Sequence, residues 1–150
     1  MKILFVCTGN TCRSPMAAGI FHHMLEESHT AGIICASAGL AAVEGQPASE
    51  NAVLACGEWG IDLSGHRAHR ITGEDLARWD VFFVMTDTQG YILEQAGASE
   101  GQIYVPENVT DPYGQDLAAY RACRDKLAEE LRRFFQEQIA PGIAAQEERP

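Results

Sequence analysis

The chain is short of positive charge. Lys and Arg together number 11 against 21 Asp and Glu, which gives a formal net charge of −10 at pH 7. A surface of this sign repels both the phosphate backbone of nucleic acids and the headgroups of anionic membranes. We therefore expect neither a nucleic acid nor a membrane among the partners of this chain.

Long apolar runs are missing as well. No stretch approaches the roughly 18 apolar residues that a membrane-spanning helix needs. No basic segment followed by an apolar one precedes the first apolar run, so the pattern of a secretory leader is also missing. These absences predict a cytoplasmic protein.

Cysteine is present but not in pairs that suggest cross-links. The 5 Cys are an odd number, form no Cys-x-x-Cys pair and have no histidine at a metal-ligand spacing. These features argue against a disulfide scaffold and against a zinc site. We expect no metal and no cofactor, and we interpret Cys35, Cys56 and Cys123 as core residues.

The composition suits one folded unit. At 150 residues and 46% hydrophobic content, the chain can bury a single core, and no repeat or linker divides it. We predict one monomeric domain over residues 1–140 and a flexible tail over 141–150.

Short apolar runs alternate with longer amphipathic segments, which is typical of βαβ units. The expected strands are 2–7, 33–37, 81–85 and 102–105, and the expected helices are 15–28, 48–59, 87–97 and 116–137, with a short capped helix from Thr72. The predicted fold is α/β, with a doubly wound four-stranded parallel sheet flanked by helices. In such sheets, ligands bind at the carboxyl ends of the strands.

The first strand runs directly into the most informative segment. Residues 7–15 read Cys-Thr-Gly-Asn-Thr-Cys-Arg-Ser-Pro. A turn from strand to helix leaves backbone N–H groups without carbonyl partners, which makes it a cradle for an anion. Gly9 tolerates a positive φ, and Ser14 followed by Pro15 is the pattern of a helix cap. In this cradle Cys7 could act as a thiolate nucleophile, while Arg13 clamps two phosphate oxygens. Alternatively, Cys7 is an ordinary core cysteine, and Arg13 is a surface residue without a role in a site.

A carboxylic acid is needed to complete phosphate chemistry. Asp111 lies in the segment Thr-Asp-Pro-Tyr-Gly after the fourth predicted strand, so it can reach the same edge of the sheet as Cys7. By spacing alone, Asp111 and Pro112 are equally consistent with an ordinary turn.

These segments resemble the low-molecular-weight protein tyrosine phosphatases over nearly the whole chain. The resemblance rests on the first strand and the 7–15 loop, Ser37-Ala38-Gly39, His66 after Gly60-Ile61, Met85 at a strand end, and Asp111-Pro112-Tyr113. The loop is most similar to that of the bacterial branch that contains protein arginine phosphatases.

The resemblance implies an active-site loop after the first strand and a cysteinyl-phosphate intermediate. Cys7 would be the nucleophile, Ser14 a donor to its sulfur, and Asp111 the general acid that then becomes the base for water. The implied phosphate-binding residues are Thr8, Gly9, Asn10, Thr11, Cys12, Arg13 and Ser14.

Supporting roles follow from the same resemblance. Asn10, Ser37 and His66 match a hydrogen-bond network that holds the loop, although from sequence alone each is more typical of a turn or cap residue. Cys12 matches a cysteine that forms a reversible disulfide with the nucleophile. Alternatively, Cys12 is a small residue that only fills space in the interior.

The substrate pocket is expected to include Thr11, Val43 and Tyr113. Tyrosine-specific relatives carry isoleucine or leucine in place of Thr11 and an aromatic residue near Val43. The hydroxyl of Thr11 and the missing ring at Val43 favour phosphoarginine on phosphorylated proteins, while Tyr113 keeps phosphotyrosine open.

Two other functions use the same loop. Arsenate reductases on this fold need two more cysteines after the third strand, and residues 80–100 contain none. A phosphopeptide-binding module would keep the cradle but has no need for Cys7, Arg13 and Asp111 together.

Overall fold

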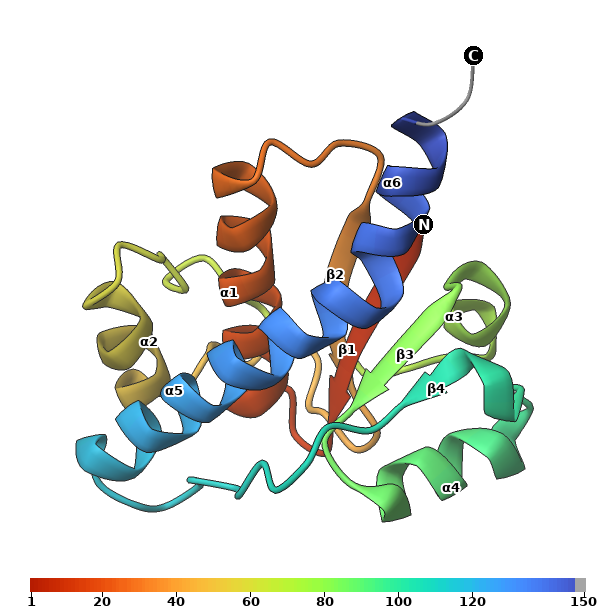
Figure 1. Cartoon of the computed structure of the whole chain (residues 1–150). Coiled ribbons are helices and arrows are strands. Elements are labelled where there is room, and N and C mark those ends of the chain that lie inside the picture. Colours follow the sequence, from red (N-terminus) through yellow and green to blue (C-terminus); the bar gives the residue numbers. More distant parts are fainter. Residues whose placement is uncertain (148–150) are drawn as a thin grey trace.

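The computed structural model describes residues 1–147 and has a four-stranded parallel sheet in the order β2-β1-β3-β4 (Figure 1). This confirms the predicted α/β fold class. The elements in chain order are β1 (Lys2–Cys7), α1 (Arg13–Glu27), β2 (Ile34–Gly39), α2 (Glu50–Gly57), α3 (Gly73–Arg78), β3 (Val81–Val84), α4 (Asp87–Ala96), η1 (Glu100–Gln102), β4 (Ile103–Tyr104), α5 (Leu117–Phe134), η2 (Phe135–Ile139) and α6 (Ala140–Glu147).

Strand β1 is buried because it lies inside the sheet and has helices on both of its faces. Ile3, Phe5 and Cys7 point to a core formed with α1, α2 and α5. Leu4 and Val6 point to a second core formed with β3, α3 and α4. The continuous apolar run of β1 is the pattern of such a doubly covered strand.

Helix α5 carries an apolar stripe along one face. Tyr120, Leu127, Leu131 and Phe134 are buried, and Leu117 is half-buried against the same core. The helix continues directly into the π-helical turn η2, where Phe135 packs against Phe21. The stripe therefore serves packing, as its spacing predicts.

Residues 141–150 are the predicted flexible tail. Of these, residues 141–147 belong to α6, which continues directly from η2, and Ile143 packs against the core. Residues 148–150 lie outside the described residues. No described helix is both long and apolar enough to cross a lipid bilayer.

The carboxyl ends of β1 and β3 meet at one edge of the sheet, where the loop after β1 and the segment 105–116 come together (Figure 1). Gly39, at the end of β2, lies against this loop. A Cβ at Gly39 would stand 2.6 Å from the carbonyl oxygen of Thr8 and 3.0 Å from Cβ of Asn10. The loop therefore approaches the sheet at a distance that only glycine allows.

We predict that Gly39→Ala lowers the free energy of unfolding by about 1–3 kcal/mol, because backbone must move to make room. Gly57→Ala is the matched control. A Cβ at Gly57, in the last turn of α2, would meet nothing within 4 Å, so only the gain in helix propensity acts there. Urea unfolding of the two variants measures the difference, and equal losses would contradict the prediction.

Candidate active site

Asn10 is the buried centre of the loop between β1 and α1. Its φ is 55°, in the left-handed region, and its exposed fraction is 0%. The side-chain Nδ2 donates to the hydroxyls of Ser14 at 2.7 Å and Ser37 at 3.0 Å, and Oδ1 accepts from the backbone N–H of His69 at 2.9 Å. Strained backbone of this kind persists only where the surroundings hold it.

His66 binds the backbone of Asn10. The Nε2 of His66 lies 2.7 Å from the carbonyl oxygen of Asn10. Because a carbonyl can only accept, Nε2 carries the hydrogen and donates it. Burial lowers the pKa of His66, which keeps the imidazole neutral at pH 7. The structure thus brings together Asn10, Ser37 and His66, and it adds His69, which sequence patterns did not indicate.

Contrary to the prediction, Ser14 does not cap α1. The helix begins at Arg13, and its N-cap, Cys12, makes no side-chain capping bond. The Ser14 hydroxyl instead lies 2.9 Å from Sγ of Cys7 and accepts from Nδ2 of Asn10. Accepting that bond leaves the hydroxyl proton of Ser14 for the sulfur.

Cys7 lies at the bottom of the loop with 3% of its surface exposed. Besides the contact with Ser14, its sulfur accepts the backbone N–H of Asn10 at 3.3 Å. A sulfur with two donors directed at it is in an arrangement that suits a thiolate. The N-terminus of α1 adds its partial positive charge.

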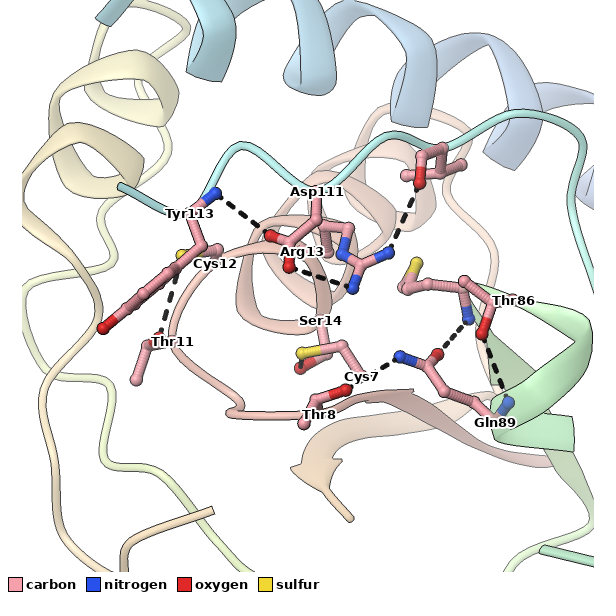
Figure 2. A network of polar contacts seen from close by, with 12 residues as sticks. Cys7, Thr8, Thr11, Cys12, Arg13, Ser14, Thr86, Gln89, Asp111 and Tyr113 are labelled. Atoms are coloured by element: carbon pink, nitrogen blue, oxygen red, sulfur yellow. Dashed lines mark hydrogen bonds and ion pairs between the residues drawn. The ribbon is translucent and has the colours of Figure 1, made fainter. Parts of the chain in front are cut away.

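Arg13 and Asp111 meet above Cys7 (Figure 2). The Arg13 guanidinium is buried, donates from Nη1 to the carbonyl of Val109 at 3.3 Å, and places Nη2 3.5 Å from Oδ2 of Asp111. Asp111 is half exposed, and its Oδ1 accepts the backbone N–H of Tyr113 at 3.0 Å. The segment after β4 therefore brings its carboxylate to the loop after β1.

A pocket of about 270 Å³ joins these groups. It is lined by Cys7, Thr8, Gly9, Thr11, Cys12, Arg13, Gln46, Asp111 and Tyr113. The predicted nucleophile, clamp and acid therefore share one cavity, with the Tyr113 side chain exposed at its rim.

The structure does not place Val43 in the pocket, contrary to the expectation. Val43 is 67% exposed and does not line the pocket, whereas Gln46 does. A turn in which the N–H of Gln46 donates to the carbonyl of Val43 at 3.2 Å separates the two side chains. Sequence spacing did not indicate Gln46, because its direction depends on this turn.

Cys12 lines the pocket close to the first turn of α5. Its sulfur lies 3.2 Å from the hydroxyl of Tyr120 and 3.4 Å from that of Ser49. Burial, more than the hydrogen bond to Cys12, raises the pKa of Tyr120 to about 12, so this hydroxyl keeps its proton at neutral pH. The reversible disulfide of Cys12 remains a prediction.

The other cysteines are core residues, as expected. Cys35, Cys56 and Cys123 are buried, and burial raises the pKa of each thiol to about 12. Residues 1–147 contain no cluster of three or more His, Cys, Asp or Glu side chains that could hold a metal ion.

The sequence of this chain is similar to those of known proteins. Residues 2–142 match the family described as low molecular weight phosphotyrosine protein phosphatase. A protein-arginine-phosphatase of Geobacillus stearothermophilus is 36% identical over 137 residues, covering 84% of this chain and 88% of the relative. A probable low molecular weight protein-tyrosine-phosphatase, EpsP, of Ralstonia nicotianae is 36% identical over 131 residues, covering 83% and 87%.

Solved structures agree in fold. A low molecular weight protein tyrosine phosphatase from T. tengcongensis superposes with a TM-score of 0.85 at 36% identity, covering 91% of this chain and 99% of that one. The YwlE arginine phosphatase, as a mutant with a phosphorylated active-site serine, has a TM-score of 0.85 at 31% identity, covering 93% and 99%. The chain belongs to the low molecular weight phosphotyrosine protein phosphatase family.

Proposed function

We propose that the chain hydrolyses phosphate from protein side chains through a cysteinyl-phosphate, with phosphoarginine as its preferred substrate. The observation that carries this proposal is the single pocket that contains the sulfur of Cys7, the guanidinium of Arg13 and the carboxylate of Asp111. Its partners are then phosphorylated proteins.

In the first step, the thiolate of Cys7 attacks phosphorus, and an S–P bond forms as the bond to the leaving group breaks. Asp111 gives its proton to the departing oxygen or nitrogen. Arg13 and the backbone N–H groups of the loop hold the equatorial phosphoryl oxygens and stabilise their charge.

In the second step, the carboxylate of Asp111 takes a proton from water. The water oxygen bonds to phosphorus, the S–P bond breaks, and inorganic phosphate leaves together with a regenerated thiolate. The phosphorylated active-site serine of the similar YwlE structure supports a covalent step of this kind.

The preference for phosphoarginine rests on the pocket wall. Relatives of both specificities are 36% identical to this chain, so overall similarity does not decide between them. Thr11 lines the pocket, and its hydroxyl, which lies 3.7 Å from Sγ of Cys12, takes the place of an aliphatic group. In its protonated form, the carboxyl group of Asp111 can accept an N–H of the phosphoarginine guanidinium through its carbonyl oxygen and give its own proton to the departing nitrogen.

A strict tyrosine phosphatase is the second candidate, and Tyr113 favours it. This side chain is 74% exposed at the rim of the pocket, where its ring could stack on a phenol. The two candidates share all of the chemistry at Cys7 and differ only in the leaving group.

The nucleophile is tested by alkylation with iodoacetamide at pH 7. We expect mass spectrometry to find Cys7 modified, and vanadate to protect it. Cys35, Cys56 and Cys123 should stay unmodified in the folded protein, because at a pKa of about 12 only about one thiol in 100,000 is ionised at pH 7. Equal labelling of Cys7 with and without vanadate would count against the proposal.

The acid is tested with aryl phosphates of different leaving-group strength. Asp111→Asn should lower kcat/KM by about 10²–10⁴-fold for phenyl phosphate, and by less for para-nitrophenyl phosphate, whose leaving group needs less protonation. Vanadate binding should persist. Glu107→Gln, which removes a carboxylate from the same segment, is the control and should keep its activity. Equal kcat/KM in Asp111→Asn and the unsubstituted protein would remove Asp111 from the mechanism.

The proposed role of Thr11 in substrate preference is tested by substituting this residue. Thr11→Ile should lower the ratio of kcat/KM for a phosphoarginine peptide to that for a phosphotyrosine peptide by roughly tenfold, since one polar contact is lost and an aliphatic one gained. Thr11→Ser, which keeps the hydroxyl, should leave this ratio close to its original value. If Thr11→Ile lowers both rates equally, another residue selects the substrate.

A further inference from the structure

Gln89 is a buried amide that neither the sequence patterns nor the mechanism above employs. It is 4% exposed and lies in the first turn of α4. Its backbone N–H donates to the side chain of the N-cap residue Thr86 at 3.2 Å, so the helix cap is complete without the Gln89 side chain. That side chain is free to bond elsewhere.

The direction of the Gln89 amide follows from its partners. Its Oε1 lies 2.9 Å from the backbone nitrogen of Met85, which can only donate. Oε1 must therefore face Met85, and Nε2 faces the other way. Nε2 then donates to Oγ1 of Thr8 at 3.2 Å, across the gap between the ends of β3 and β1 (Figure 2).

This bond orients the hydroxyl of Thr8. Because Oγ1 accepts from Gln89, its own proton must point away from that amide. Thr8 lines the same pocket as Cys7 and Arg13. The main chain of Thr8 is held as well, since its carbonyl accepts the N–H of Ala41 at 2.9 Å.

The packing of α4 delivers Gln89 to this position. Gly90 is the next residue, and a Cβ there would stand 3.2 Å from Ile103 and 3.6 Å from Val84. The first turn of α4 therefore lies closely on β3 and β4, where even a Cβ at position 90 would require the side chain of Ile103 to give way. Close packing fixes the reach of the Gln89 amide to Thr8.

We propose that Gln89 is a positioning residue that directs the hydroxyl proton of Thr8 into the pocket, where Thr8 donates to the bound phosphoryl group. This inference rests on the proposed phosphatase function. It gives Thr8 a side-chain contact with the substrate in addition to its backbone N–H, and it gives α4 a part in the site.

The test is a double-mutant cycle between Thr8→Val and Gln89→Met, read as kcat/KM for para-nitrophenyl phosphate and as inhibition by vanadate. We expect Thr8→Val to lower kcat/KM roughly tenfold, which is typical of losing one hydrogen bond to a charged group. Gln89→Met should lower it by a similar factor in the original protein and by less than twofold when Thr8→Val is already present. Weaker vanadate inhibition should follow the same pattern.

Gln102→Met is the matched control. The Gln102 amide also accepts a backbone N–H, from Ser99 at 3.0 Å, and donates to a backbone carbonyl, that of Trp79 at 3.4 Å, but it does not contact Thr8. This variant should lose stability and keep kcat/KM.

Gln89→Glu covers the case in which Gln89→Met does not fold. It keeps an acceptor for Met85 and replaces the donor by an oxygen, so the Thr8 proton turns toward the carboxylate. We expect Gln89→Glu to lower kcat/KM more in the original protein than in Thr8→Val, where only the added charge acts.

Equal loss in both backgrounds, or an unchanged kcat/KM in Thr8→Val, would overturn the role of Gln89. The proposed function is judged separately, because turnover by the unsubstituted protein and its loss in Cys7→Ser do not depend on Gln89.

Discussion

The site depends on one backbone conformation, the left-handed turn at Asn10. This turn directs the N–H of Asn10 at Cys7 and places the Asn10 side chain in the interior, where a buried amide must find partners. Ser14, Ser37 and the backbone of His69 supply them, and His66 binds the carbonyl. The strain of the loop is thus held by residues from three different parts of the chain.

The polar groups around the sulfur form an ordered chain of donors. Asn10 donates to Ser14, and this leaves the Ser14 proton for Cys7. At Thr8, the residue after Cys7, Gln89 donates to the hydroxyl in the same way. In both cases an amide whose direction is fixed by other bonds sets the direction of a hydroxyl, which could otherwise rotate freely. The net charge of −10 would repel an anion at long range. The donors around the pocket act at contact distance, where they outweigh distant charges that salt screens.

Much of the fold and part of the site could be predicted from sequence. The apolar run of β1 and the stripe of α5 report burial directly, and the 7–15 segment together with Asp111 pointed to the right edge of the sheet. The predicted start of α1 was wrong by two residues, because the Ser14 hydroxyl contacts the sulfur rather than capping the helix. Gln46 and Gln89 could not be predicted. Their positions depend on a turn and on the packing of α4, neither of which leaves a periodic pattern in the sequence.

The order of these elements along the chain has a consequence for biosynthesis. Cys7 is synthesised well before His69, which supplies the last partner of Asn10, and before Asp111 and Tyr120. A parallel sheet cannot close around β1 until the later strands are made. The donors around the sulfur of Cys7 therefore assemble only after His69 has been synthesised, and the cavity that Asp111 completes forms later still.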